Sequence, residues 1–401
     1  MSDRIAIIGA GSTGSSTAYH LSKTGVPVVL IERDEIGHGM TSRSTAVVRT
    51  HYSNEIVAKM ALYSLKILRD FSSIGNSGFT ECGMLILGSP NFRTALEANV
   101  KMLKSVGVDE LVLSKSDAQK SFPYLNLEDC SVDGYIALEP ESGYADPVAT
   151  AGSYAARARE LGAEIILRNG VQRLETRDGR LASVILADGS KINCERAILC
   201  TNVWTNNLLS RSGVDKDDFL PVRAVPHPVV VYRRPQDYQG RRVVVSDYYN
   251  KAYYKSEGQS LLFGGSIDAS IDDLTVDPDN APSDVPFEYI SDYSERISKR
   301  IPAMKNAEFH SAYIGMYDIT PDEHPIIDDL SSVLGIEGLY CCVGLSGHGF
   351  KLCPAFGVIN TEMILGIDPG RQTFDRSHFS LDRFKTGKLL STKYEGLGSV
   401  A

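Results

Sequence analysis

The start of the chain has an apolar run, then apolar residues at helical spacing, then a second apolar run. This order predicts a strand, a helix and a second strand. Ile5 to Ile8 form a short apolar run, as expected for a strand that is buried on both faces. Residues with helical spacing follow, and Gly25 ends that helix. Val26 to Ile31 form the second buried run. Together these segments predict a β-α-β unit, the building block of a parallel sheet.

Gly9, Gly11 and Gly14 lie where the first strand turns into the helix, and Glu32 ends the second strand. In a dinucleotide-binding unit the first glycine permits the tight turn, the second lets a pyrophosphate approach the backbone, and the third lets helix and strand pack closely. The phosphates bind at the helix N-terminus, where free N–H groups and the helix dipole favour anions. The carboxylate of Glu32 lies where such a unit needs an acceptor for the hydrogen bond of a ribose hydroxyl. The combination predicts a site for an adenine dinucleotide.

The rest of the chain mixes helices with many short strands. Helical spacing predicts helices over 55–71, 92–106 and 286–301, and a further helix from about 354. Residues 220–313 are richer in β-type runs such as HPVVVYRR and SLLFGGS. We therefore expect an α/β protein in which a dinucleotide-binding domain is assembled from separated pieces, with a β-rich domain inserted. The polar tail beyond residue 371 is expected to wrap the surface.

Composition narrows the range of partners and locations. The formal charge of −9 and the pI of about 5.5, with no basic block, argue against nucleic acid as a partner. The seven cysteines are scattered without C-x-x-C spacing, which favours reduced thiols and a cytoplasmic location. The strand pattern begins almost at the first residue, so we expect no signal peptide. No stretch approaches the roughly 20 apolar residues that a membrane span requires.

A second glycine-rich turn lies near the end of the chain. Gly344, Gly347 and Gly349 follow an apolar run and precede the last expected helix. Such a turn offers backbone N–H groups to the polar edge of a ring. A flavin must be held at both its phosphates and its isoalloxazine ring and uses two such loops, whereas a nicotinamide cofactor does not need the second. The alternative is a turn that serves only the chain topology.

Four segments carry a resemblance to a known family: GAGSTG with Glu32-Arg33 after it, GHGMTSRSTAVVR, TPDEHPIID and GLSGHGFK. Together they resemble the D-amino-acid-oxidase-type FAD oxidoreductases, and most of all the sarcosine oxidase and glycine oxidase branch. The resemblance implies an FAD-binding Rossmann-like domain of the glutathione-reductase type, expected at 1–80, 140–218 and 315–370. It also implies an inserted β-sheet-rich substrate domain, expected at 81–139 and 219–314, and leaves a C-terminal tail at 371–401.

The resemblance implies roles for individual residues. Arg49 and Lys351 match an arginine and a lysine that bind the substrate carboxylate in that family. The planar guanidinium of an arginine can bind both carboxylate oxygens, and the ammonium group of a lysine adds a second positive charge. Tyr317 and His348 are expected to belong to the catalytic site with them. FAD contacts are expected from Gly9, Gly11, Gly14, Glu32, Arg33, Ser42, Arg43, Ser44, Thr45, Val171, Gly315, Gly344, Gly347, His348, Gly349, Phe350 and Lys351.

These residues also have structural alternatives. Arg49 could form an ordinary ion pair, Lys351 could lie without a ligand at a helix edge, and His348 could bond the backbone of its turn. Tyrosines in a β-rich domain more often serve packing than binding. With that reservation, further pocket candidates are Tyr248, Tyr249, Tyr253 and Tyr254.

Three positions depart from the family pattern. Gly315 stands where monomeric sarcosine oxidase attaches its flavin through a cysteine, so we expect FAD to be bound non-covalently. Leu262 stands where that enzyme has a lysine poised for oxygen, which favours a dehydrogenase or a subunit that passes electrons to a partner. Asn202 replaces a glycine in CTNVW and leaves the backbone path there open.

The predicted activity is FAD-dependent oxidation of a small amine or amino acid by hydride transfer to the flavin, giving an imine that hydrolyses. The expected substrates are sarcosine-like N-methyl or secondary amino acids, glycine or proline. Oxygen or another electron acceptor completes the reaction, and the chain could be a subunit of a larger complex. Two alternatives stay open, namely oxidation of a 2-hydroxy acid and a flavoprotein subunit without turnover.

The stretch IGMYDITPDEHPIIDD is unusually acidic, with Asp322, Glu323 and His324 in a row and Asp328 shortly after them. Consecutive side chains point in different directions after the turn expected at Pro321, so we do not expect a metal site. We interpret the acids as groups that bond the turn and connect the two domains.

Overall fold

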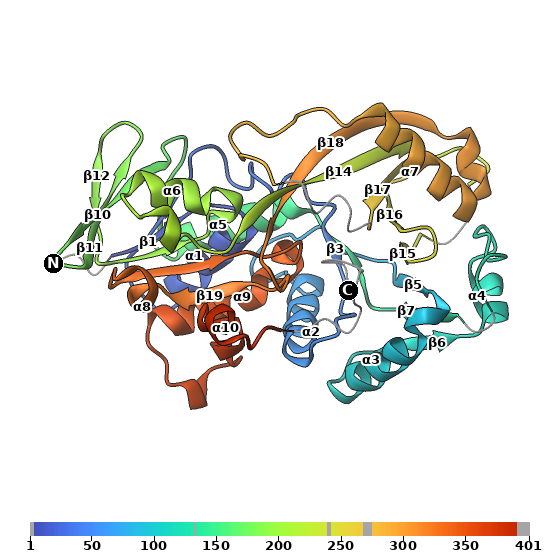
Figure 1. The fold of residues 1–401 in the computed structure, drawn as a ribbon, viewed down its shortest axis with the longest axis horizontal. Coiled ribbons are helices and arrows are strands. Elements are labelled where there is room, and N and C mark those ends of the chain that lie inside the picture. The colour runs from blue at the N-terminus through green and yellow to red at the C-terminus, as the bar shows by residue number, and fades with distance from the viewer. Residues whose placement is uncertain (1–3, 132–133, 239–241, 268–274, 391–401) are drawn as a thin grey trace.

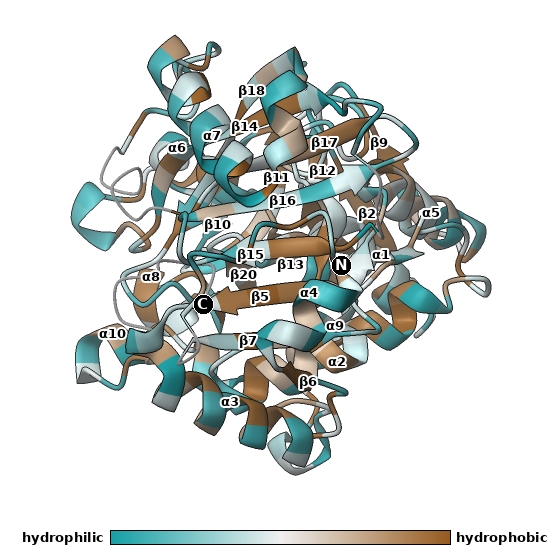
Figure 2. Cartoon of the chain, turned by 90° about the vertical axis from the view of Figure 1, so that its right-hand side faces the viewer, coloured by the Kyte–Doolittle hydropathy of each residue, from teal (hydrophilic) through white to brown (hydrophobic). Residues whose placement is uncertain are grey.

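The computed structural model describes residues 4–131, 134–238, 242–267 and 275–390. Two large β-sheets organise these residues, with helices packed on their outer faces (Figure 1). Figure 2 shows hydrophobic residues along strands such as β5 and β13 and hydrophilic residues on the outer turns of the helices. None of the helices in the described ranges is long and apolar enough to cross a membrane.

The first sheet has six strands in the order β19-β20-β13-β1-β2-β9. Five of them run parallel and β19 is antiparallel at the edge. The predicted β-α-β unit is confirmed as β1, α1 and β2. The bounds are β1 Ile5–Ile8, α1 Ser12–Ser22, β2 Val28–Ile31, β9 Glu164–Ile166, β13 Arg196–Leu199, β19 Ile326–Asp329 and β20 Leu339–Val343.

Alternate residues of this sheet point into two different cores, which is why its strands are apolar throughout. Ile5 and Ile7 belong to a core shared with α1, α2, α5 and α9. Ala6 and Ile8 pack on the opposite face against β10, β11, β12 and α6. The bounds are α2 Glu55–Arg69, α5 Pro147–Glu160, β10 Val171–Arg177, β11 Arg180–Leu186, β12 Lys191–Asn193, α6 Thr205–Arg211 and α9 Gly349–Ile364.

The second sheet has eight strands in the order β18-β14-β17-β16-β15-β5-β7-β6. Helices α4 and α7 pack on one face and α3 on the other. The bounds are β5 Met84–Gly88, α3 Arg93–Ser105, β6 Leu111–Leu113, α4 Lys115–Ser121, β7 Tyr135–Glu139, β14 Arg223–Arg233, β15 Val244–Asp247, β16 Ala252–Glu257, β17 Leu261–Ser266, α7 Phe287–Arg300 and β18 Glu308–Ile319.

Strand β18 connects the two sheets. It pairs with β14 over its whole length, from Glu308 opposite Arg233 to Ile319 opposite Arg223, and the chain then enters β19 of the first sheet. The domain boundary expected at 314/315 falls inside this continuous strand, and the division into domains stays a prediction. A small sheet of β3 Val47–Val48, β4 Thr80–Glu81 and β8 Gly143–Tyr144 lies near the junction.

Helix α9 begins at Gly349, five residues before the start expected from the sequence, and Pro354 lies inside it. Proline favours the first turn of a helix, so local preference alone places the start too late. The earlier start brings the glycine turn directly onto the helix N-terminus.

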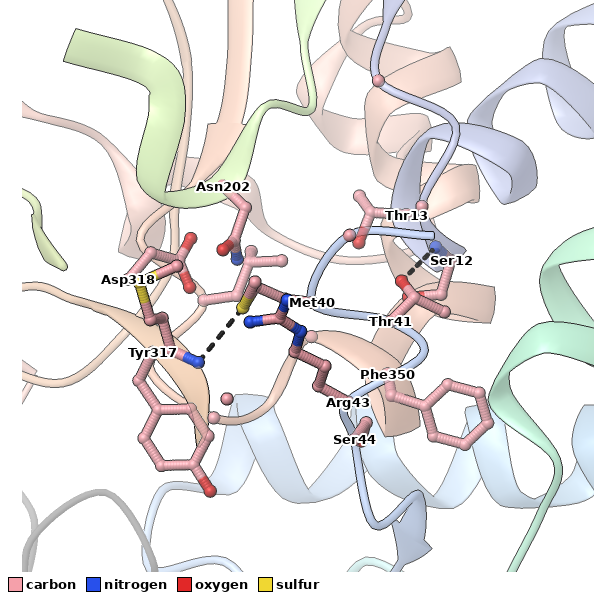
Figure 3. A pocket seen from close by; sticks show the side chains of 18 of the residues that line it. Ser12, Thr13, Met40, Thr41, Arg43, Ser44, Asn202, Tyr317, Asp318 and Phe350 are labelled. Carbon is pink, nitrogen blue, oxygen red and sulfur yellow. Dashed lines mark hydrogen bonds between the residues drawn. The ribbon is translucent and has the colours of Figure 1, made fainter. Parts of the chain in front are cut away.

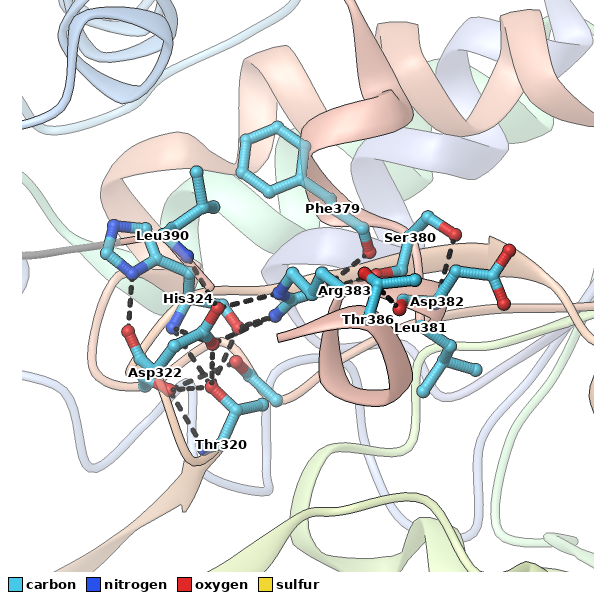
Figure 4. A network of polar contacts seen from close by, with 12 residues as sticks. Thr320, Asp322, His324, Phe379, Ser380, Leu381, Asp382, Arg383, Thr386 and Leu390 are labelled. Atoms are coloured by element: carbon cyan, nitrogen blue, oxygen red, sulfur yellow. Dashed lines mark hydrogen bonds and ion pairs between the residues drawn. The ribbon is translucent and has the colours of Figure 1, made fainter. Parts of the chain in front are cut away.

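The C-terminal segment is anchored by the acidic stretch rather than lying loosely on the surface. Arg383, in α10 (Asp382–Thr386), donates to both carboxylate oxygens of Asp322 at 2.7 and 3.0 Å (Figure 4). The same guanidinium donates to the carbonyl of His324 at 2.9 Å. Asp328 accepts from the Ser380 hydroxyl at 2.8 Å.

Asp322 and Asp328 therefore bind the C-terminal segment, a role that was not predicted from the sequence, and the interpretation that the acids connect two domains stays a prediction. Their expected role in the turn is present, because the His324 N–H donates to Asp322 at 3.3 Å. Asp329 accepts from the N–H of Ser331 at the start of α8 (Ser331–Leu334). Within the described ranges, no three His, Cys, Asp or Glu side chains gather as metal ligands would.

Candidate functional site

A long cavity runs from the glycine turn after β1 to the strands of the eight-stranded sheet. Its lining extends from Gly9 and Gly11 at one end to His227 and Tyr253 of the eight-stranded sheet at the other. A cavity lined over this range suits an extended ligand such as a dinucleotide.

The glycine turn forms one end of the cavity. Gly9 has φ of +101° and lines the cavity together with Gly11. A Cβ at Gly14 would lie 1.8 Å from the Gly9 carbonyl oxygen, so this position serves close packing of helix and strand rather than the cavity wall. The Ser12 N–H donates to the Thr41 hydroxyl at 3.0 Å and joins the turn to the segment after β2 (Figure 3).

Glu32 and Arg33 lie at the same end. The Glu32 carboxylate accepts from the Ala10 N–H at 2.7 Å and from the Asp34 N–H at 3.1 Å, and it faces the cavity. The Arg33 guanidinium lies 4.0 Å from the ring centre of Trp204. Both side chains line the cavity, as does Val171.

The segment after β2 contributes the middle of the wall. Arg43, Ser44 and Thr45 line the cavity, whereas Ser42 does not, because its hydroxyl donates to the carbonyls of His38 at 2.8 Å and Gly39 at 3.0 Å. Met40 and Thr41 line it as well and were missed from the sequence. Both residues belong to the segment GHGMTSRSTAVVR that carries the family resemblance, but which of its side chains face the cavity depends on turns that the sequence does not show.

Two cations face the far part of the cavity. Arg49 follows β3, is 4% exposed, and stacks its guanidinium 4.2 Å from the ring centre of Tyr52 while donating to the His51 carbonyl. The Lys351 ammonium donates to the Gly347 carbonyl at 3.0 Å. Burial lowers the pKa of Lys351 well below its usual value, and the positive charge of Arg49 lowers it further. Their mutual repulsion favours an anionic ligand.

Buried acids hold the segment that carries Arg49. The Thr50 N–H and hydroxyl donate to Glu139 of β7, and His51 Nδ1 lies 2.7 Å from Glu110 Oε1. Burial raises the pKa of Glu139, and the nearby charge of Glu110 raises it further. These contacts fix the backbone directly after Arg49, and the pairing of β3 with β8 fixes the backbone directly before it, so the guanidinium is held in one position.

Three aromatic rings are stacked in the wall formed by the eight-stranded sheet. His227 lies between Tyr317, at 4.4 Å between ring centres, and Tyr253, at 5.7 Å, with its Nε2 3.0 Å from the Tyr253 hydroxyl. Burial lowers the pKa of His227 to about 4, so the imidazole is neutral near pH 7. Of the four further tyrosine candidates, Tyr253 lines the cavity, whereas Tyr248 and Tyr249 do not, and Tyr254 packs in the core on the other face of the sheet.

The second glycine turn meets this wall. Gly347 and Gly349 line the cavity, and a Cβ at Gly347 would lie 3.2 Å from the Tyr317 ring. Gly344 and His348 are not among the lining residues; His348 packs behind the wall with its Nδ1 3.1 Å from the Tyr52 hydroxyl. Burial lowers the pKa of His348 well below its usual value, so it is a neutral supporting group in this structure.

Several lining residues were missed or misjudged from the sequence. Asn202 adopts φ of +50°, a left-handed conformation that asparagine tolerates better than most residues, so the backbone keeps a path suited to glycine. Asp318 lies on β18 beside it and lines the cavity. Leu262 is fully buried in the core on the other face of the sheet. Its side chain does not reach the cavity, so Leu262 gives no support to the expected dehydrogenase, and the choice of electron acceptor stays a prediction.

The residues present fit FAD. The turn at Gly9 and Gly11 offers a backbone cradle at the N-terminus of α1, and the glycine turn before α9 offers another. Three buried side-chain oxygens of cavity-lining residues lack a hydrogen-bond partner among the described residues: Thr13 Oγ1, Asn202 Oδ1 and Asp318 Oδ2. A dinucleotide rich in phosphates and hydroxyls can satisfy such groups.

Comparisons with known proteins agree with this geometry. The profile of the family described as FAD dependent oxidoreductase matches residues 4–363. FAD-dependent oxidoreductase domain-containing protein 1 of Bos taurus is 25% identical over 424 residues, covering 96% of this chain and 85% of the relative. Mitochondrial sarcosine dehydrogenase of Mus musculus is 24% identical over 392 residues, covering 95% of this chain but 41% of the relative. The chain thus spans less than half the length of that relative.

Among solved structures, L-proline dehydrogenase from P. horikoshii superposes with a TM-score of 0.86 at 23% identity, covering 97% of this chain and 99% of the other. Glycine oxidase from Geobacillus kaustophilus gives a TM-score of 0.78 at 19% identity, covering 95% and 99%. These likenesses show the expected α/β fold with its FAD-binding domain. The chain belongs to the FAD dependent oxidoreductase family, and FAD is its cofactor.

Proposed function

We propose that this protein oxidises a small amine or amino acid, such as a sarcosine-like secondary amino acid, glycine or proline. The observation that carries the proposal is the pair Arg49 and Lys351, which face one part of the cavity. Among the described residues, the acids that line the cavity are Glu32 and Asp318, and neither forms an ion pair with the two cations. A substrate carboxylate supplies the missing charge.

The protein's part in the reaction is positioning. Arg49 offers a rigid fork and Lys351 a point charge, and together they hold the carboxylate so that the neighbouring carbon is fixed in place. Bound FAD would accept a hydride from that carbon, or from the N-methyl carbon of a sarcosine-like substrate. The resulting imine hydrolyses in water to a carbonyl compound and an amine, which stay in one molecule where the substrate is cyclic like proline. The neutral His227 adds no third positive charge beside the substrate amine.

The relatives support the same substrate class and leave the acceptor open. Their names include sarcosine dehydrogenase and sarcosine oxidase subunit beta, the latter of Rhizobium meliloti at 25% identity over 403 residues, covering 98% of this chain and 91% of the relative. A subunit among the relatives supports membership of a larger complex. The reduced flavin passes its electrons to oxygen or to a partner protein. A cytoplasmic location remains part of the proposal, supported by seven free cysteines.

An anaerobic substrate screen tests the function. The holoenzyme is mixed without oxygen with sarcosine, proline, glycine, D-amino acids and 2-hydroxy acids, and loss of flavin absorbance is recorded. We expect bleaching by one of the amino acids. A primary amine should release ammonia, and an N-methyl amine should release methylamine or formaldehyde, according to which carbon is oxidised. Bleaching by a 2-hydroxy acid alone would favour the alternative oxidation, and no bleaching by any compound would contradict the proposal.

A further inference from the structure

Asp318 and Asn202 form a polar pair in the cofactor cavity that the function above does not use. Asp318 is 1% exposed, and one of its carboxylate oxygens, Oδ2, has no partner among the described residues. The side-chain carbonyl oxygen of Asn202 is also buried without a partner there. Figure 3 shows the carboxyl and carboxamide groups close together, and the Asn202 amide is near enough to hydrogen-bond Asp318.

The Gly344 and Leu345 N–H groups and the Asn202 amide donate to the Asp318 carboxyl group, but Asp318 Oδ2 and the Asn202 carbonyl oxygen remain two buried acceptors without a donor among the described residues. This arrangement is unfavourable, because each oxygen loses its hydrogen bonds to water on burial. A proton on the Asp318 carboxyl group removes the conflict, because it turns one of the two acceptors into a donor. The protonated Asp318 gains an O–H donor for the Asn202 carbonyl or for a ligand oxygen, while the Asn202 amide donates back. The left-handed backbone of Asn202, φ +50°, is what brings this side chain to the cavity wall.

Within the part of the chain that the structure describes, no neighbouring positive charge holds Asp318 ionised. It forms no ion pair with any described residue; β14 places Ala224 opposite it, and the loop after β20 contributes the N–H groups of Gly344 and Leu345. The titratable neighbour on β20 is Cys342, whose thiol burial keeps neutral by raising its pKa well above the usual value. Burial raises the pKa of Asp318 to about 7, despite the backbone and Asn202 hydrogen bonds that act in the opposite direction.

We propose that Asp318 binds FAD as a neutral carboxylic acid, paired with Asn202, so that FAD binding above neutral pH takes up one proton at Asp318. The inference concerns the cofactor and holds whichever amine is oxidised. FAD carries two phosphate charges and displaces water from the cavity. Both effects disfavour a carboxylate in the same cavity, and the proton is therefore held more tightly in the complex than in the free protein.

The sign of the pH dependence follows from this difference. Below pH about 7 the free protein already carries the proton, so affinity is independent of pH. Above that value the free protein must take up the proton on binding, and the Kd of FAD rises by up to about tenfold per pH unit. The rise ends where the carboxyl group of the complex itself ionises.

The test measures FAD binding to apoprotein by flavin fluorescence and by calorimetry in two buffers of different ionisation enthalpy. For the wild type at pH 8 we expect uptake approaching one proton per FAD, and little uptake by this group at pH 6. Asp318→Asn mimics the neutral acid in shape and charge. It should bind FAD within a few-fold of wild type at pH 6 and more tightly than wild type at pH 8.5, with the uptake removed.

Asp279→Asn is the matched control. Asp279 accepts from the Trp204 indole N–H at 2.9 Å but is exposed, so this variant should keep the proton uptake of the wild type. Equal uptake by wild type and Asp318→Asn would overturn the proposal, as would loss of FAD by a folded Asp318→Asn. Should that variant not fold, the wild type decides by itself, because an FAD affinity that stays constant from pH 7 to 9 would contradict the inference.

Discussion

Replacement of Arg49 gives the most direct test of how the site recognises its substrate. The side chain is 4% exposed, stacks on Tyr52 and uses one N–H for the His51 carbonyl, which leaves the rest of its fork for a ligand. Truncating one partner of a buried, hydrogen-bonded charge pair costs about 2–5 kcal/mol. At about 1.4 kcal/mol per factor of ten, Arg49→Ala should weaken binding of a carboxylate substrate by roughly 30- to 4,000-fold.

Arg49→Lys should lie between wild type and alanine, because it keeps a positive charge but loses the planar fork and the stacking on Tyr52. The assay is anaerobic stopped-flow reduction of the flavin, which separates substrate Kd from the reduction rate. Each variant is measured with the amino acid and with its methyl ester, which lacks the carboxylate charge. Arg43→Ala is the control for a lost cavity arginine, since its Nη1 bonds the Ile314 carbonyl and it lies in the segment assigned to FAD.

The decisive quantity is the ratio of the substrate Kd values for the methyl ester and the amino acid, which measures the preference for acid over ester. Arg49→Ala should lose most of this preference while the FAD content of the protein stays close to one per chain. Arg43→Ala should keep the preference even where FAD binds more weakly. If Arg49→Ala weakens acid and ester by the same factor, Arg49 does not bind the carboxylate and the reasoning is refuted.

Three further predictions concern the cofactor and the fold. Gly14→Ala should purify with little FAD, because its Cβ would lie 1.8 Å from a backbone carbonyl oxygen. Gly152→Ala is the control, since a Cβ there meets open space, and it should keep one FAD per chain. The ratio of flavin absorbance to protein absorbance measures the FAD content of both variants. Arg383→Met should lower the free energy of unfolding by about 3–5 kcal/mol in urea titrations, since it leaves Asp322 buried without its cation, and adding Asp322→Asn should restore part of the loss. Acid precipitation of the native protein should release all FAD into the supernatant, because Gly315 offers no sulfur for a covalent bond; flavin retained in the pellet would contradict this.

The pair of Asp322 and Arg383 also predicts a direction for acid unfolding. Burial would raise the pKa of Asp322, but the hydrogen bonds and charge of Arg383 outweigh it, and the pKa lies below its ordinary value. The contribution to stability is therefore complete above the unfolded-state pKa of about 3.9 and is lost as pH falls through the lower folded value. In Arg383→Met this acid-dependent loss should be absent from the unfolding curves.

The sequence predicts the dinucleotide end of the molecule well because its signals are local. Strand, glycine turn, helix and second strand follow one another within β1, α1 and β2, and each step depends on neighbours a few residues away. The same is true of α2 and α3, whose apolar spacing marks their bounds to within two residues. The far end of the cavity is different, because it is assembled from strands that are distant in sequence.

Its missed residues illustrate the difficulty. His227 lies in a β-type run that reads as ordinary core, and only the pairing of β14 with β18 brings its ring against Tyr317. Leu262 was judged from alignment alone, yet strand alternation turns its side chain into the opposite core. A shift of one residue in register would exchange these outcomes, and register is set by long-range pairing.

Three aspartates from one short stretch show how partners decide chemistry. Asp322 meets Arg383, which lies 61 residues further along the chain, and the pKa of its carboxyl falls. Asp328 meets the Ser380 hydroxyl of the same tail segment and serves as an anchor. Asp318 meets no cation among the described residues; it faces a cavity beside Asn202, and burial raises its pKa to about 7. The sequence shows three equivalent acids, and the fold makes two of them structural and leaves the third with a proton to exchange when the cofactor binds.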